Sequence, residues 1–263
     1  MSCYGALGYT TPNIDRLGSE GTRFTNFLTT QAVCTASRAA LLTGCYPNRL
    51  SLSGALMPWA TNGLHPDEET LAELLRERGY ATGAFGKRHL GHHPEFLPRQ
   101  QGFDEYFGLP YSNDMWPVND DGTSATSGQK GRFPLLPMID GDSPVDTIRT
   151  LFDQDQLTRR LTERAVGLIN KHRNGKPSGR RNDGYPLGMN GIRGENTENY
   201  ATEAGLYDLR HDPGERYDIS KQHPELKKDL ESLAEKARAD LGDDIQKRKG
   251  ANVRAGRQVS TTR

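Results

Sequence analysis

Three amphipathic helices are predicted by the spacing of apolar residues along the chain. Aliphatic residues recur at intervals of three and four over residues 69–80, 153–172 and 224–241, with polar residues between them. This spacing places the apolar side chains on one face of each helix, where they can meet a core. The repeats are carried by Leu71, Leu74 and Leu75, by Leu157, Leu161, Val166 and Ile169, and by Leu226, Leu230 and Leu233.

Two shorter helices are predicted from the residues that begin and end them. Over residues 11–17, Thr11 suits the N-cap and Pro12 suits the first helical position. Residues 37–43 are good helix formers. The expected stops are Gly18 or Gly21 for the first helix and Gly44 for the second.

Strands are harder to find in this chain. Residues 23–30, rich in Phe and Thr, and residues 81–85 are typical of short strands. A parallel sheet that is covered on both faces needs near-continuous Val, Ile and Leu runs, and no stretch of the sequence provides one. The predicted α/β protein therefore has an incomplete sheet.

Glycine, proline and polar residues predict long irregular stretches. Little regular structure is expected over residues 91–153, and residues 120–131 are typical of an exposed loop. Residues 174–202 have the composition of a linker. Order is expected to resume with a strand-like segment at 206–209 and a turn at 212–215, and the basic tail from Gln246 is expected to fray.

Composition and charge remove several classes of function. The 263 residues suffice for one large domain or two modest ones, but only 33% are hydrophobic. The 34 basic and 34 acidic residues balance, which argues against a general nucleic-acid binder. No apolar run is long enough for a membrane span, no signal peptide is visible, and three cysteines are too few for a disulfide framework or a zinc site.

Cys34 is the first candidate for chemistry. It is expected just before the helix over residues 37–43, where unpaired backbone N–H groups favour anions, and Arg38 adds a guanidinium that suits an oxyanion. This pattern is typical of a nucleophile that faces an anionic group. The alternative is a buried cysteine beside a capped helix, since a free cysteine is commonly a small core residue. Spacing alone leaves both interpretations open.

The segment from Cys34 to Gly44 resembles the signature of the type I sulfatases. In that family, the cysteine of a Cys-x-(Pro/Ala)-Ser-Arg motif is oxidised to formylglycine. Further segments similar to the family are Thr11–Leu17, Arg23–Phe27, Thr70–Leu75, Gly79–Thr82, Gly86–Gly91, Gly102–Gly108 and Leu206–Glu215. The resemblance implies an alkaline-phosphatase-like α/β sandwich, with a mixed sheet between helices that is incomplete here, and a small C-terminal α+β subdomain.

The resemblance also implies a domain organisation. Residues 1–173 correspond to the N-terminal part of the catalytic domain. Residues 174–202 form a linker or a deletion junction, and residues 203–263 form the C-terminal subdomain with its frayed tail. The extreme N-terminus of the family and a long middle section are expected to be missing.

Four residues receive catalytic roles from the resemblance. Cys34, as formylglycine, would be hydrated and attack the sulfur of a sulfate ester, and Arg38 would hold the hydrate. Lys87 and His89, two positions apart at the end of a strand, would project to one side and stabilise the hydrate and the sulfate oxygens. Arg88 stands where the family often has an aromatic residue. His92 and His93 are interpreted as surface residues.

Calcium is the cofactor that the resemblance implies, beside the formylglycine derived from Cys34, which would itself contact the metal. The family supplies further ligands from an Asp–Asp pair and an Asp–Asn pair, as a hard cation requires. Neither pair is identifiable in the sequence. Asp120–Asp121 and Asn113–Asp114 are the available substitutes, and both are interpreted as turn residues.

The implied function is a sulfuric ester hydrolase. Its partners would be a small-molecule or glycan sulfate ester and a formylglycine-generating or other sulfatase-maturing enzyme. The family is usually periplasmic, extracellular or lysosomal. Two alternatives stay open: a non-catalytic truncated remnant or faulty gene model, and a formylglycine-dependent phosphonate or phosphate ester hydrolase.

Overall fold

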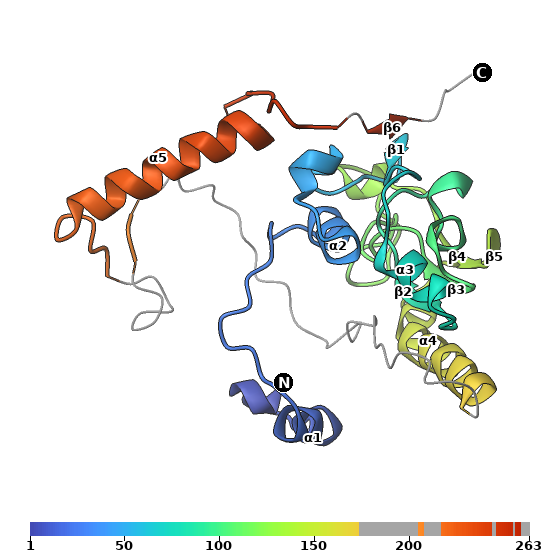
Figure 1. Cartoon of the computed structure of the whole chain (residues 1–263). Helices are drawn as coiled ribbons and strands as arrows, with labels where there is room; N and C mark the ends of the chain where they lie inside the picture. Colours follow the sequence, from blue (N-terminus) through green and yellow to red (C-terminus); the bar gives the residue numbers. More distant parts are fainter. Residues whose placement is uncertain (174–204, 208–216, 244–245, 255, 259–263) are drawn as a thin grey trace. The chain divides into compact units, whose positions relative to one another are not determined.

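The computed structural model describes residues 1–173, 205–207, 217–243, 246–254 and 256–258. The linker predicted over residues 174–202 and the turn at 212–215 lie outside the described residues, as does half of the segment 206–209. The chain forms two compact units, residues 1–30 and residues 31–263 (Figure 1). Within the described residues, none of the helices combines the length and the apolar character that a membrane span needs.

The first unit contains a 3-10 turn (η1, Ser2–Tyr4) and one helix (α1, Pro12–Glu20). The helix begins after Thr11 as predicted and continues through Gly18 to end at Gly21, the later of the two expected stops. Asp15 accepts hydrogen bonds from the Ser2 hydroxyl at 2.6 Å and the Thr11 hydroxyl at 2.9 Å. These bonds lower the pKa of Asp15 to about 2 and tie the helix to the N-terminal turn.

The strand predicted over residues 23–30 is wrong. The backbone has no strand there and pairs with no other strand among the described residues. Phe24 and Phe27, 65% and 72% exposed, contact one another edge-on at 6.0 Å between ring centroids. Strand propensity alone does not form a strand when no neighbouring strand is present to complete the ladder of hydrogen bonds.

The second unit is built on a four-stranded mixed sheet (Figure 1). The first pair is parallel and the other two pairs are antiparallel. The strand predicted over residues 81–85 is confirmed, displaced by two residues. In spatial order the strands are β2 (Gly83–Lys87), β3 (Glu105–Leu109), β4 (Leu136–Asp140) and β5 (Ser143–Ile148).

Three of these strands contradict the prediction of little regular structure over residues 91–153. Pro137 in β4 and Pro144 in β5 argue against a strand in the sequence, because proline cannot donate to a ladder. Pro144 lies on the edge strand β5, opposite an irregularity in the register of β4. Pro137 pairs with β5, whereas β4 pairs with β3 only through Ile139 and Asp140. The exposed loop expected over residues 120–131 is largely confirmed.

A close approach of two glycines joins β2 to β3. Gly86 has φ +131° and pairs with Gly108. A Cβ atom on Gly108 would lie 1.9 Å from the carbonyl oxygen of Gly86, far inside van der Waals contact. Only glycine therefore fits at residue 108 next to the end of β2.

The helices of the second unit begin close to their predicted starts, apart from the first. Capping boxes fix two starts, because the Thr70 hydroxyl accepts from the Glu73 N–H and the Thr150 hydroxyl from the Asp153 N–H, with each carboxylate accepting in return. The helices are α2 (Cys34–Thr43), α3 (Leu71–Glu77), α4 (Leu151–His172) and α5 (Pro224–Leu241), with 3-10 turns η2 (Pro47–Leu50), η3 (Pro94–Phe96), η4 (Pro98–Gln101) and η5 (Lys130–Arg132).

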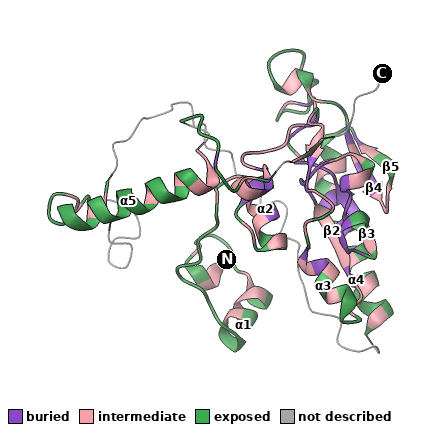
Figure 2. Ribbon diagram, turned by 45° about the horizontal axis from the view of Figure 1, so that its top comes forward, coloured by how far each residue is buried: buried purple, intermediate pink, exposed green. Residues whose placement is uncertain are grey.

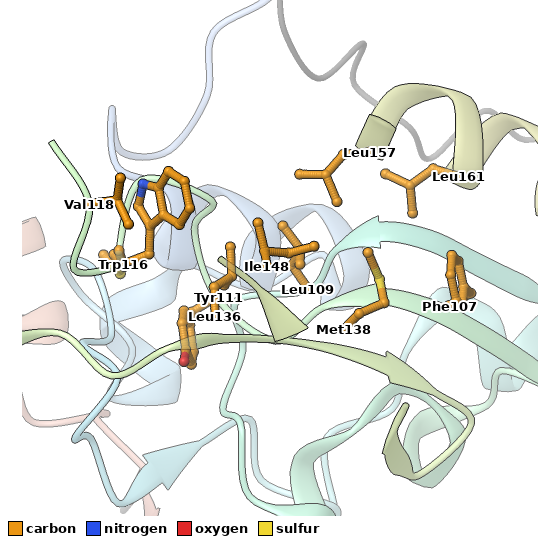
Figure 3. Packing of buried hydrophobic residues seen from close by; sticks show 11 residues of the cluster. Phe107, Leu109, Tyr111, Trp116, Val118, Leu136, Met138, Ile148, Leu157 and Leu161 are labelled. Atoms are coloured by element: carbon orange, nitrogen blue, oxygen red, sulfur yellow. The ribbon is translucent and has the colours of Figure 1, made fainter. Parts of the chain in front are cut away.

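Helix α4 covers one face of the sheet and completes the main core. Leu157 and Leu161 point from α4 into a cluster with Phe107, Met138 and Ile148 (Figure 3). The second half of the predicted repeat is wrong, because Val166 and Ile169 are exposed. The opposite face of the sheet packs differently, and its buried residues are Leu97, Tyr106 and Ile139.

Helix α5 has the predicted bounds but an exposed apolar face. Leu226, Leu230 and Leu233 are all exposed, and no residue of α5 is buried (Figure 2). An ion pair between Arg49 and Asp240 holds its C-terminal end. The tail that follows, expected to fray, forms β6 (Arg257–Gln258), which pairs with β1 (Asn62–Gly63).

Candidate functional site

Cys34 is the first residue of α2, not a residue before the helix as the sequence predicts. Val33 takes the N-cap position with an extended backbone. The Ser37 N–H donates to the Val33 carbonyl at 2.9 Å, which closes the first turn three residues earlier than expected. The Ser37 hydroxyl also donates to the carbonyls of Gln31 and Val33 at 2.6 and 2.8 Å. The side chain of Ser37 therefore fixes the segment that presents Cys34.

Leu56 joins the start of α2 to His89. The Leu56 N–H donates to the hydroxyl of Thr35, which is fully buried, at 3.1 Å. The Leu56 carbonyl lies 2.7 Å from Nε2 of His89. Main-chain groups of one residue thus hold both the residue after Cys34 and the imidazole.

Lys87 ends β2 next to Cys34 and Arg38. Nη1 of Arg38 donates to the Lys87 carbonyl at 2.5 Å, and Nζ of Lys87 donates to the Ser112 hydroxyl at 3.3 Å. Burial lowers the pKa of Lys87, while the neighbouring sulfur of Cys34, which lies within hydrogen-bond reach, opposes this shift. The ammonium therefore lies beside the thiol, and the guanidinium of Arg38 adds a second positive charge.

His89 is almost completely buried and neutral at pH 7. Its backbone is left-handed, with φ +57°, so the alternation of the strand ends here. Burial is the main cause that lowers the pKa of His89 to about 4, and the charges of Lys87 and Arg38 add to it. Because Nε2 lies against the Leu56 carbonyl it carries the proton, which leaves a lone pair on Nδ1. Nδ1 is buried without a hydrogen-bond partner among the described residues.

Arg88 faces away from Lys87, on the opposite side of the strand. Its guanidinium donates to Oε1 of Gln101 and lies 5.8 Å from the ring centroid of Phe103. Burial is the main cause that lowers its pKa to about 10. The arginine thus fills the interior position in which the family often has an aromatic side chain, and it does not contact Cys34.

Ser112 and Asp114 belong to this site, and the sequence analysis did not assign them to it. They lie in the turn after β3, whose end meets the end of the parallel strand β2. The charge of Asp114 raises the pKa of both Lys87 and His89. The turn is held from α4, because Nδ2 of Asn113 donates to Oε1 of Gln154 at 3.2 Å and Nε2 of Gln154 donates to the Asn113 carbonyl at 2.7 Å.

His92 and His93 are not surface residues as predicted. Both are half-buried, and their rings stack at 4.5 Å between centroids. The ring of His92 also contacts Tyr111 edge-on, and burial is the main cause that lowers its pKa to about 4. Aromatic packing therefore draws the imidazoles inward.

The described residues do not form a complete calcium site. No group of three or more His, Cys, Asp or Glu side chains in the described part of the chain could hold a metal ion. Asp121 accepts from the N–H and hydroxyl of Thr123 at 2.9 and 2.7 Å, as the interpretation of a turn residue requires. Asp120 forms an ion pair with Lys130. Asp114 places a carboxylate near the cationic residues of the site.

The helix that presents Cys34 and the strand that ends at Lys87 both lie in the part of the chain that one family model matches. The chain belongs to the sulfatase family, whose sequence model matches residues 1–178. It is 50% identical over 120 residues to arylsulfatase A of Homo sapiens and 42% identical over 134 residues to arylsulfatase G of Homo sapiens. These alignments cover 44% and 51% of this chain, which spans about a quarter of the length of either relative, 24% in both cases.

Solved sulfatase structures share the fold. The PsFucS1 sulfatase from Pseudoalteromonas sp. matches 70% of this chain and 42% of its own, with a TM-score of 0.54 and 30% identity. The structure of Ps i-CgsB matches 65% of this chain and 38% of its own, with a TM-score of 0.52 and 29% identity. The predicted alkaline-phosphatase-like α/β fold is confirmed, with a mixed sheet that corresponds to part of the sheet in these relatives.

Proposed function

We propose that the chain carries the catalytic residues of a sulfuric ester hydrolase, with formylglycine derived from Cys34 as the nucleophilic residue. The observation that supports this most is the convergence of Cys34 with Lys87 and Arg38, which brings two cations to one potential nucleophile. A sulfate ester carries a negative charge that such a cluster attracts. Conversion of Cys34 requires a separate sulfatase-maturing enzyme.

The formylglycine would supply an aldehyde hydrate whose two hydroxyl groups serve in turn as nucleophile at sulfur and as the group that releases sulfate. Around it, Arg38 and Lys87 bind the sulfate oxygens and offset the charge that develops on them. Nδ1 of His89, which has no partner among the described residues, accepts a hydrogen bond from a hydroxyl group in the site. Ser112 holds the ammonium of Lys87 in position.

Calcium is the expected metal of this family, but no step is assigned to it because the described residues do not complete its ligand set. Asp114 is the one carboxylate near the cluster. The substrate class follows from the family. One relative in the comparisons is an N-acetylgalactosamine-6-sulfatase, and a matching structure holds k-i-k-neocarrahexaose. We therefore assign sulfated glycans or small sulfate esters to this chain as substrates.

The test is hydrolysis of 4-nitrophenyl sulfate by the chain co-produced with a formylglycine-generating enzyme. Conversion of Cys34 is first confirmed by peptide mass spectrometry. We expect release of nitrophenol that is lost in Cys34→Ala. Cys45→Ala is the matched control, because Cys45 is a second partly buried thiol outside the site, and it should retain the activity.

Two outcomes would contradict the proposal. A converted chain that releases no product at any calcium concentration would support the non-catalytic alternative. Faster hydrolysis of 4-nitrophenyl phenylphosphonate than of the sulfate would support the phosphonate hydrolase instead.

A further inference from the structure

The second unit carries an exposed cluster of aromatic and cationic side chains. Of the two tryptophans of the chain, Trp116 is 4% exposed and Trp59 is 48% exposed. The Trp59 ring stacks on Phe133, with 5.8 Å between centroids and 22° between planes. The guanidinium of Arg132, an exposed residue, lies 5.3 Å from the centroid of Trp59. Trp59, Arg132 and Phe133 are called the aromatic platform below.

The main chain connects the platform directly to the candidate site. Trp59 lies in a tight turn in which the Ala60 N–H donates to the Met57 carbonyl at 2.8 Å. This turn begins immediately after Leu56, the residue whose carbonyl bonds to His89. Three Cα steps separate Trp59 from Leu56, so their Cα atoms are at most about 11 Å apart. The platform therefore borders the site.

The two segments of the platform are held together and anchored. Nε2 of Gln129 donates to the sulfur of Met57 at 3.7 Å, which ties the segment before Arg132 to the turn of Trp59. Met57 and Phe133 both pack against the core cluster beneath α4. The aromatic surface is thus pre-organised, which reduces the entropy that a ligand must overcome on binding.

The chemistry of the platform fits one class of ligand. A sugar ring offers a face of C–H bonds with partial positive charge, which complements the negative face of an indole. An arginine beside the indole binds a sulfate group in bidentate fashion. The sulfate ester of an otherwise uncharged alcohol, or a small aryl sulfate, would use neither feature once its ester group lies at Cys34. A sulfated polysaccharide would use both, because its neighbouring residues extend from the site and carry further sulfates.

We propose that the aromatic platform is a subsite for a sulfated polysaccharide, which stacks one sugar residue on Trp59 and pairs a second sulfate with Arg132 while its scissile ester lies at Cys34. This inference rests on the proposed function for the position of the ester. The binding itself does not depend on turnover.

The test measures binding of a κ-carrageenan hexasaccharide to the full chain with Cys34→Ala, so that hydrolysis cannot interfere. Trp116→Phe leaves Trp59 as the single tryptophan, and its fluorescence should change on titration. We expect Trp59→Ala, followed by calorimetry, to raise the Kd about tenfold, and Trp59→Phe to raise it less. Arg132→Met should also weaken binding and reduce its dependence on salt.

Controls separate this inference from the proposed function. Tyr46→Ala removes an equally exposed aromatic side chain beyond the C-terminal end of α2 and should leave the Kd unchanged. Hydrolysis of 4-nitrophenyl sulfate by the converted parent chain tests the proposed function separately, because this substrate is too small to span from Cys34 to the platform. Equal Kd values for the parent chain and Trp59→Ala, with the same far-ultraviolet circular dichroism and melting temperature for both, would overturn the subsite. So would equal affinity for the desulfated hexasaccharide.

Discussion

Buried imidazoles make the site sensitive to acid. The pKa of His89 and that of His92 both lie at about 4, below the ordinary value of 6.5, chiefly because of burial. Lys87 and Arg38 lower the pKa of His89 further and His93 lowers that of His92, whereas Asp114 opposes them at His89. Between pH 6.5 and 4 the unfolded chain therefore binds protons at these two histidines, and the folded chain does not.

The free energy of unfolding should decrease as the pH is lowered from 6.5 to about 4. Above pH 6.5 each imidazole is neutral in both the folded and the unfolded chain, so it does not affect stability. As the pH falls from 6.5 to about 4, only the unfolded chain gains the proton, and the free energy of unfolding decreases progressively. For His89 alone the loss is about 3 kcal/mol. Urea unfolding at pH 7, 6, 5 and 4.5 measures it, with His89→Asn and His92→Phe as variants with a shallower pH slope. Phe can still contact Tyr111, whereas Asn is too short to reach the Leu56 carbonyl, so the pH slopes and not the absolute stabilities of the variants are compared. A free energy of unfolding that is constant over this range would contradict the prediction.

At the residue scale, sequence reasoning found the part of the site that is contiguous in the chain. Cys34 and Arg38 share one motif, and Lys87 and His89 share another, so their chemistry could be recognised without a fold. Ser112 could not be found in this way, because its contact with Lys87 depends on the parallel pairing of β2 with β3. Asn113–Asp114 were interpreted by turn propensity alone, which says nothing about the charges that the turn faces.

Two glycines offer a matched comparison at the scale of elements. Gly108→Ala should unfold the second unit or destabilise it by about 3 kcal/mol or more, since its Cβ would collide with backbone of β2 that cannot move without breaking the pair. Gly167→Ala lies in α4 with open space around the new methyl group. It should stabilise the chain by about 0.5–1 kcal/mol through helix propensity.

Thermal unfolding followed by circular dichroism measures both changes. Gly128→Ala gives a milder comparison, because its Cβ meets open space but its backbone is left-handed, with φ +66°, so it should cost only about 1–2 kcal/mol. A Gly108→Ala protein with the parent melting temperature would show that β2 and β3 do not approach as closely as described.

Helices were easier to predict than strands for a physical reason. A helix satisfies its own hydrogen bonds, so caps such as Thr150 and Asp153 fix its start locally. A strand depends on its neighbour, and residues 23–30 have strand propensity but no partner among the described residues. Strands β4 and β5 exist despite their prolines, and Pro144 lies on the edge strand opposite an irregularity in the register.

At the scale of the whole molecule, several large apolar side chains among the described residues are exposed to solvent. Leu226, Leu230 and Leu233 form an exposed apolar stripe on α5, and the chain spans about a quarter of the length of its curated relatives, 24% in the arylsulfatase comparisons. Exposed apolar patches promote association. The 263-residue chain should therefore self-associate through this helix at micromolar concentration.

Replacement of two leucines tests this expectation. Leu230→Gln with Leu233→Gln should reduce the sedimentation coefficient and the binding of a hydrophobic dye, while the melting temperature stays within a few degrees. Gln and Leu have similar helix propensities, and neither leucine is buried. Lys228→Gln on the same helix is the control and should change neither. Unchanged association of the double variant would exclude this stripe as the contact.

The class of fold was predictable and the extent of its sheet was not. Helix patterns that alternate with short strand-like segments indicate an α/β protein, and the motif order indicates the family. The core beneath α4 escaped prediction because its residues come from short, separate segments, Phe107 from β3 and Met138 from β4 among them. None of these segments is long enough to show a hydrophobic period by itself.

The left-handed backbone at His89 has an evolutionary consequence. Any side chain with a Cβ costs about 1–2 kcal/mol in that conformation, whereas glycine adopts it freely and asparagine tolerates it better than most residues. A mutation of His89 to either residue would relax the backbone and also remove a buried imidazole. The backbone strain that such a mutation relieves would offset only part of the stability that it costs, because it also removes a buried side chain and leaves the Leu56 carbonyl without its partner. A histidine that persists at this position in descendant genes would therefore serve packing as well as chemistry.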